Sequence, residues 1–211
     1  ILIDGQGQAM RSLKPQDRMN PNWIATAATN DPWVNTEDLD IAYGKFDGPW
    51  GGELENIRWE RWLAYHKPKD QRLGFWIVKD HISGTTKHDL EFLLHFFPGE
   101  ISWNESQGTI TTDYGAESGN VLVKFPDTKD LRFDAACGRK DPARGWFSQE
   151  YGKIQSAYEM ATHRQVQLPY THHMVFVPFK ETVPEIDISV SDNHLEVSIN
   201  NQIHSVDIDP I

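Results

Sequence analysis

Short segments rich in β-branched and aromatic residues follow one another along the whole chain, and each is ended by Gly, Pro, Asn or Asp. They recur roughly every ten residues, which is the spacing typical of an all-β sandwich or barrel. The pattern therefore predicts an all-β fold with little or no helix: a large, supersandwich-like antiparallel β-sandwich of roughly a dozen strands. The expected strands cover 23–29, 38–43, 57–66, 75–82, 88–97, 108–113, 121–125, 131–137, 171–178, 186–190, 195–199 and 203–208.

The C-terminal segments show the alternation most clearly. Ile186, Ile188 and Val190 share one face of a strand, and polar residues occupy the other face. The turns expected at 191–193 and 200–201 lead into two further segments with the same period. This region is predicted to be a three-stranded meander with one polar face.

The segment 88–97 leaves a choice between two structures. Leu90 and Leu94 belong to a set that also fits the helical period, so periodicity alone does not decide. The turn signals at Gly84 and Pro98 bracket a length of about ten residues and favour a strand.

Composition and charge exclude several classes of protein. The chain has 211 residues, with 20 Lys and Arg against 31 Asp and Glu, and its net charge of −11 argues against a nucleic acid or an anionic membrane as partner. No apolar run approaches the ~18 residues needed to cross a bilayer. The single Cys137 excludes an intramolecular disulfide and a multi-cysteine metal site. Since no linker interrupts the pattern, we expect one domain over residues 1–211.

Histidines and carboxylates offer few candidate sites. No His-Glu-x-x-His motif occurs, and the adjacent His172 and His173 point to opposite faces of an expected strand. Asp38 and Asp40 share a strand face, with Asp47 after the next turn. Such carboxylates could hold a calcium ion or act as an acid/base pair, and the same pattern fits turn caps and solvated strand positions.

Aromatic residues give a second kind of candidate. Trp50, Trp59, Trp62, Trp76 and Tyr65 could form a platform on which sugar rings stack, and they could equally fill a sandwich core. Trp59 and Trp62 differ by three positions, so they face opposite sides of a strand and at least one belongs to the core.

Several motifs resemble, in the same order, those of one enzyme family. The opening sequence ILIDGQGQ resembles the strand and turn that begin the C-terminal β-domain of heparinase II/III-like polysaccharide lyases, which include related alginate and oligoalginate lyases. Two positions depart from the family pattern: Phe147, where Arg is frequent, and Trp59, where His is frequent. The other similar segments are 39–48, 61–68, 75–84 with His88 and 92–96, and 145–152.

The resemblance implies a mechanism and a domain organisation. These lyases cleave uronic-acid-containing chains by β-elimination, using residues of an α-helical toroid and of β-strands that precede the position of Ile1. We therefore expect a fragment of a larger chain, cut inside the polypeptide at Ile1, that is inactive alone and carries no catalytic residue. No cofactor is expected in this fragment, whereas the full-length protein could hold a structural zinc ion.

The resemblance also implies partners and a location. The expected partners are an anionic or uronate-containing polysaccharide and the protein's own N-terminal α-helical domain, in the bacterial periplasm, at the cell surface or outside the cell. Because an acidic surface repels a polyanion, the basic residues of the substrate channel would lie in the other domain, or the polymer would be less charged. The candidate sugar contacts are Trp50, Trp59, Trp146 and Tyr151. The alternative is a non-catalytic carbohydrate-binding or structural β-sandwich module.

Overall fold

The computed structural model describes residues 1–8, 33–46, 50, 54–70 and 72–208. This part of the chain forms strands, turns and bends without a helix, so no described helix could cross a membrane. The predicted all-β fold is confirmed, with nineteen strands among the described residues in place of roughly a dozen. The expected strand 23–29 and Asp47 lie outside the described residues.

The largest sheet has eight antiparallel strands in the order β2-β3-β4-β5-β16-β9-β8-β7. The sequence predicts all of them except β2 and β7. The six predicted strands alternate between apolar and polar residues or form a continuous apolar run. The strands span Trp33–Asn35 (β2), Leu39–Phe46 (β3), Arg58–His66 (β4), Phe75–Ser83 (β5), Tyr170–Phe179 (β16), Asn120–Lys124 (β9), Thr109–Asp113 (β8) and Glu100–Asn104 (β7).

A four-stranded sheet, in the order β1-β6-β15-β10, contains one long strand that the sequence did not predict. Strand β15 pairs with β6 from Glu159 to Gln167, yet its inward positions include the polar Thr162 and Arg164, so no apolar alternation marks it. Segment 88–97 is the strand β6, as predicted. The strands span Leu2–Ile3 (β1), Lys87–His95 (β6), Tyr158–Gln167 (β15) and Arg132–Cys137 (β10).

The predicted C-terminal meander is confirmed as a three-stranded sheet of β17 (Ile186–Ser191), β18 (His194–Ile199) and β19 (Gln202–Asp207). Its turns place Asp192, Asn200 and Asn201 at positive φ, a conformation that Asp and Asn tolerate. Two small hairpins complete the structure and were not expected from the sequence. They pair β11 (Arg139–Lys140) with β12 (Ala143–Arg144) and β13 (Trp146–Glu150) with β14 (Lys153–Ser156).

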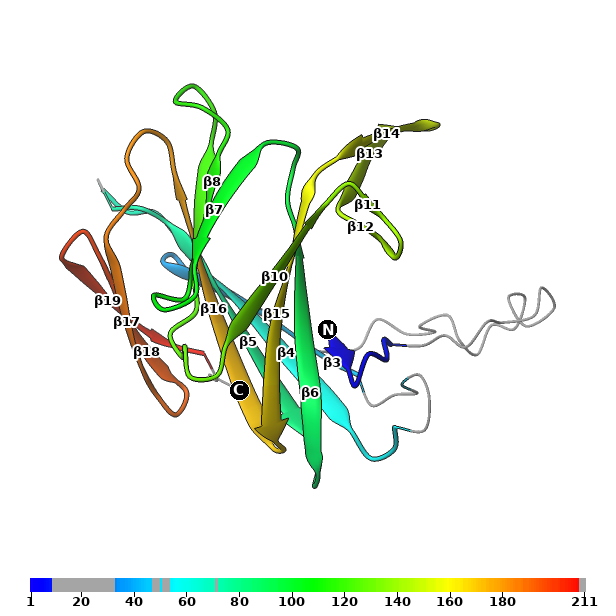
Figure 1. Ribbon diagram of the computed structural model, residues 1–211. Coiled ribbons are helices and arrows are strands. Elements are labelled where there is room, and N and C mark those ends of the chain that lie inside the picture. Colours follow the sequence, from blue (N-terminus) through cyan, green and yellow to red (C-terminus); the bar gives the residue numbers. More distant parts are fainter. Residues whose placement is uncertain (9–32, 47–49, 51–53, 71, 209–211) are drawn as a thin grey trace.

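The eight-stranded sheet is the middle layer, with the three-stranded sheet on one face and the four-stranded sheet on the other (Figure 1). Alternate residues of β5 show this, since Phe75 and Ile77 pack with Leu195 of the three-stranded sheet, whereas Val78 packs with Met160 of the four-stranded sheet. Both faces of the central strands are therefore buried, which explains their continuous apolar runs.

Candidate functional site

One part of the middle sheet keeps an exposed face. One face of β4 carries the alternate side chains of Trp59, Arg61, Leu63 and Tyr65. The four-stranded sheet covers this same face of the middle sheet over β5, β16 and β9. On β4 this cover is incomplete, because Leu63 remains 42% exposed. An apolar residue in the middle of a central strand is normally buried, so this region is a candidate surface for a ligand or partner.

Arg61 is the charged residue at the centre of this face. Its Nε donates to Asp80 Oδ1 at 2.6 Å and its Nη2 donates to Oδ2 at 2.8 Å, which is the two-pronged geometry of a strong arginine–carboxylate pair. Asp80 is fully buried and also accepts from Trp59 Nε1 at 2.7 Å. The two hydrogen bonds to Asp80 fix the plane of the Arg61 guanidinium, and the bond from Trp59 holds the carboxylate that accepts them.

The remaining side of Arg61 is open. Its side chain is 41% exposed, and Nη1 has no partner within the described part of the chain. The Trp59 ring lies 4.8 Å from the guanidinium carbon, a cation–π contact that supports the group from one side. Arg61 is therefore held rigidly while one of its nitrogens can still bind an acceptor from outside.

A cavity of about 400 Å³ lies over this arginine. Among the described residues, the charged ones that line it are the basic Lys45 and Arg61. An anionic group beside an apolar ring or chain fits this combination of charge and surface. The lining consists of Gln8, Ala42, Tyr43, Gly44, Lys45, Phe46, Trp59, Arg61 and Leu63.

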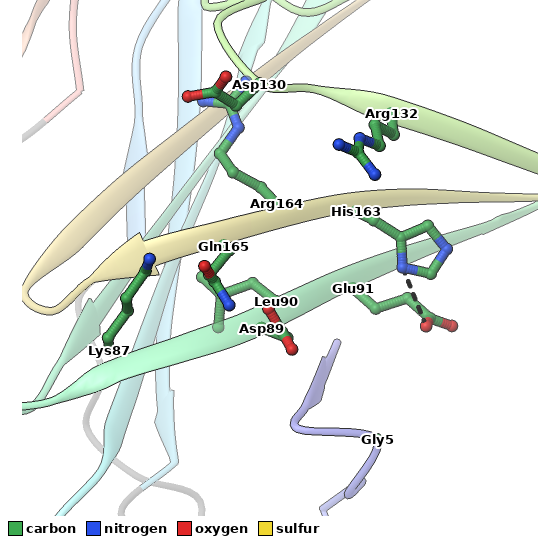
Figure 2. Close-up of a pocket in the computed structure, with 10 residues that line it drawn as sticks. All are labelled: Gly5, Lys87, Asp89, Leu90, Glu91, Asp130, Arg132, His163, Arg164 and Gln165. Atoms are coloured by element: carbon green, nitrogen blue, oxygen red, sulfur yellow. Dashed lines mark ion pairs between the residues drawn. The ribbon is translucent and has the colours of Figure 1, made fainter.

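A second cavity, of about 510 Å³, lies on the outer face of the four-stranded sheet (Figure 2). Arg132, His163 and Glu91 form a row across three neighbouring strands, and His163 Nδ1 lies 3.3 Å from Glu91 Oε2. Three Lys or Arg residues and three carboxylates line the cavity together with His163, so the charges of its Lys, Arg, Asp and Glu side chains balance. It offers hydrogen-bonding groups for a neutral polar ligand but no excess positive charge for a polyanion.

A serine, a histidine and an aspartate also lie in line on the outer face of the three-stranded sheet. Ser205 Oγ is 3.0 Å from His194 Nε2, and His194 Nδ1 is 2.7 Å from Asp207 Oδ1. The Asp207 side chain is 77% exposed, so water screens the pair that would have to activate the serine. We assign this line no catalytic role.

The four candidate sugar contacts fall in two places. Trp50 is buried, donates from Nε1 to the carbonyl of Ile57 at 3.0 Å, and has its ring 6.4 Å from that of Trp59, which lies beside Arg61 at the candidate site. Trp146 begins β13, and Tyr151 lies fully exposed in the turn between β13 and β14. The structure does not bring the four together.

The carboxylates considered for a metal are paired with lysines. Asp38 Oδ1 lies 3.0 Å from Lys69 Nζ and Asp40 Oδ1 lies 2.8 Å from Lys67 Nζ. The hydrogen bond from Lys67 lowers the pKa of Asp40. No group of three His, Cys, Asp or Glu side chains suited to a metal ion occurs among the described residues.

The Arg61–Asp80 pair leaves only a weak signal in the sequence. Asp80 stands inside the apolar segment 75–82, where a carboxylate needs a buried partner. The partner follows from the register of β4 and β5, in which Arg61 lies directly opposite Asp80.

Comparison with known proteins identifies a shared fold. A scan against models of known protein families finds no match, and a search of curated proteins finds none either. Among solved structures, a mutant of the heparan sulfate lyase HepC from Pedobacter heparinus is similar with a TM-score of 0.68 and 15% identity, over 86% of this chain and 28% of that one. A structure described as heparinase III gives a TM-score of 0.59 and 14% identity, over 83% of this chain and 26% of that one.

These similarities concern the fold. The identities are low, and the chain spans little more than a quarter of the length of the lyases it matches. The architecture described above is therefore that of the β-domain region of these two structures.

Proposed function

We propose that this chain is the C-terminal β-domain of a heparinase II/III-like polysaccharide lyase, an enzyme that cleaves uronic-acid-containing polysaccharide by β-elimination. The shared fold and the ordered sequence motifs support the assignment. Arg61 is the observation that carries the proposal, because a rigid, half-exposed arginine in a cavity whose described lining holds no carboxylate suits the carboxylate of a uronate.

The chemistry explains why such an arginine would help. A base removes the proton at C5 of the uronate, the electron pair forms the C4–C5 double bond, and the oxygen on C4 leaves with its bonding electrons. Negative charge develops on the carboxylate as the proton is removed, so a fixed guanidinium there stabilises the transition state. Asp80 and Trp59 keep Arg61 in place, and no reorganisation is needed when the charge appears.

The base belongs to another part of the enzyme in this proposal. The resemblance places the base before Ile1, in the helical domain or the strands that precede this chain. Arg61 therefore binds and neutralises the carboxylate, and the chain alone does not complete the reaction.

The zinc ion that the resemblance allows is not assigned to the described residues. Asp38 and Asp40 are occupied by lysines, and the described residues offer no group of three metal ligands. In this proposal a zinc ion would be held by residues that precede Ile1.

Several finer points belong to the same proposal. The substrate is an anionic polysaccharide such as heparan sulfate or alginate, and the covalently attached partner is an N-terminal α-helical domain that supplies most of the basic channel. The enzyme acts in the bacterial periplasm, at the cell surface or outside the cell. The net charge of −11 supports an arrangement in which this domain contributes one arginine to the substrate channel rather than a large basic surface.

A non-catalytic carbohydrate-binding module is the second candidate. The observation in its favour is the fully exposed ring of Tyr151, which lies in the turn between β13 and β14, apart from Arg61 on β4. Such a module would bind sugar chains without a preference for uronate.

Calorimetric titration with oligosaccharides separates the two candidates. Uronate oligosaccharides from heparan sulfate or alginate should bind more tightly than neutral oligosaccharides of the same length, and ultraviolet absorbance should show no unsaturated uronate formed by this chain alone. Equal affinity for neutral oligosaccharides would favour the second candidate. Formation of unsaturated uronate by the chain would show that the base lies within it.

A further inference from the structure

We propose that the β13–β14 hairpin is an arm that binds a polysaccharide chain at a place separate from Arg61. This inference rests on the proposed function, because it gives the polysaccharide a second contact on the same domain. Figure 1 shows the hairpin standing out beyond the main sheets, near the upper right of the view. Its two strands pair only with each other.

The arm exposes nearly all of its side chains. Every residue of β13 and β14 except Phe147 is exposed, including Ile154 at 69%. A two-stranded hairpin with no covered face is at best marginally stable in water. An exposed hairpin of this kind gains stability when a partner covers it, so it is a candidate surface for a partner.

The base of the arm is fixed to the body. The carbonyl of Gly145 accepts from the backbone amides of Gly138 at 2.7 Å and Ala157 at 3.0 Å. Gly145 has φ +71, and a Cβ there would stand 2.4 Å from the carbonyl oxygen of Ala136. Trp146 Nε1 donates to the carbonyl of Arg139 at 2.7 Å. These contacts set the direction in which the arm projects.

A bulge shapes the middle of the arm. The register shifts between Phe147 and Glu150, and Ser148 Oγ donates to the carbonyl of Glu150 at 2.9 Å. Bulges twist a strand and re-aim its side chains, and they are frequent beside binding sites. Phe147 packs edge-on against Phe97 with ring centroids 5.2 Å apart, so the bulge is anchored from below.

The chemistry of the arm fits a sugar chain better than a protein. Tyr151 presents a free ring in the turn, and Gln149 and Gln155 present planar amides that both donate and accept hydrogen bonds. Lys153 Nζ and Glu150 Oε2 pair at 2.5 Å, so the charges of the arm balance. A cavity of about 530 Å³ is lined by this hairpin, which supplies all of its described lining residues.

Sugar rings combine an apolar face with a rim of hydroxyl groups, and the arm offers a partner for each. The ring of Tyr151 at the tip supplies apolar contact and the amides serve the hydroxyls, whereas Ile154 faces the side of the hairpin opposite to Gln155. A protein interface would instead need a continuous apolar centre, and polar residues interrupt the apolar ones here.

The test compares Tyr151→Ala and Gln155→Ala with wild type in calorimetric titrations against heparan sulfate and alginate oligosaccharides. Trp103→Ala is the matched control, because Trp103 is an exposed aromatic on β7, outside the arm and at the other edge of the eight-stranded sheet from the strands β3 and β4 that line the Arg61 cavity. We expect Tyr151→Ala to lower the affinity roughly fivefold, Gln155→Ala to lower it less, and the control to leave it unchanged.

The outcomes separate the arm from the proposed function. Unchanged affinity in Tyr151→Ala, with wild-type binding that depends on Arg61, would overturn the arm and leave the proposed function standing. Lower affinity in Tyr151→Ala, with binding indifferent to Arg61, would support the arm and count against the role of Arg61. Failure of wild type to bind any of these oligosaccharides would overturn both.

Discussion

Arg61 and Asp80 face each other across β4 and β5 and share two parallel hydrogen bonds, with the carboxylate fully buried and the guanidinium half-exposed. The Arg61–Asp80 pair thus serves both the stability of the fold and the proposed binding of substrate. Asp80 needs Arg61 to compensate its buried charge, and Arg61 needs Asp80 to hold its plane.

Replacement of Asp80 by Asn should weaken both roles. The amide cannot accept both arginine donors and the indole donor of Trp59, so the free energy of unfolding should fall by about 2 kcal/mol. Urea denaturation measures this change. Asp187→Asn, at an exposed position of β17, is the control and should shift the midpoint little. An Asp80→Asn variant as stable as wild type would contradict the structural half of the account.

Acid should destabilise the fold well before carboxylates titrate. Burial, together with Lys79, lowers the pKa of His173 to about 4, and burial lowers the pKa of His66 and of His204, whose rings lie 4.7 Å apart. In the unfolded chain a histidine titrates near pH 6.5. Between that pH and about 4 the unfolded state therefore binds protons that the folded state does not bind. Stability should therefore decrease as the pH falls through this window, by about 3 kcal/mol for His173 alone.

Thermal unfolding of His173→Gln at several pH values checks this expectation. The variant should show a shallower loss of stability between pH 6.5 and pH 4 than wild type. Identical slopes in wild type and His173→Gln would show that His173 is not a neutral histidine of the folded state.

The strand pattern was readable from the sequence where one face of a strand is apolar. The meander 186–208 and the strands β4, β5 and β16 followed from alternation or from apolar runs. Strand β15 escaped because buried polar groups occupy its inward face: Arg164 is 5% exposed and bonds to Asp127 and to the hydroxyl of Tyr170. No periodicity signals a buried arginine whose partners lie in the connection after β9 and on β16.

The candidate site was only partly predictable for a related reason. Trp59 was a candidate as an aromatic residue, but its contact with Arg61 and Asp80 depends on the register between two strands. Trp50 has the same composition-based argument in its favour and lies in the core. Composition identifies candidates, whereas the pairing of strands decides which of them meet.

Tyr170 should resist ionisation. Burial raises its pKa to about 12, and its hydroxyl is bonded to Arg164. Ultraviolet titration should therefore show one tyrosine, absent from Tyr170→Phe, that ionises only near or above pH 12. Tyr170→Phe should also lose about 1 kcal/mol of stability, because Arg164 loses an acceptor. If the tyrosine lost from the titration curve in Tyr170→Phe is one that ionises near pH 10, the prediction is wrong.

The base of the β13–β14 arm should depend on glycine at position 145. In Gly145→Ala the new Cβ would collide with the Ala136 carbonyl, in addition to the strain of φ +71. We expect a loss of stability of about 2–4 kcal/mol. Gly152→Ala is the matched control, since φ is +77 there and nothing lies within 4 Å of the added carbon, so it should cost about 1 kcal/mol. Equal losses would show that the close approach at Gly145 is not tight.

The central claim is that Arg61 binds the carboxylate of a uronate. The most direct measurement compares a uronate oligosaccharide with the same oligosaccharide whose carboxyl groups are reduced to alcohols, on wild type and on Arg61→Lys, which keeps a positive charge near Asp80 but loses the fixed outer nitrogen. The account predicts that wild type prefers the carboxylated form roughly tenfold and that Arg61→Lys loses most of this preference. Equal affinity of wild type for the two oligosaccharides, or an undiminished preference in Arg61→Lys, would contradict it.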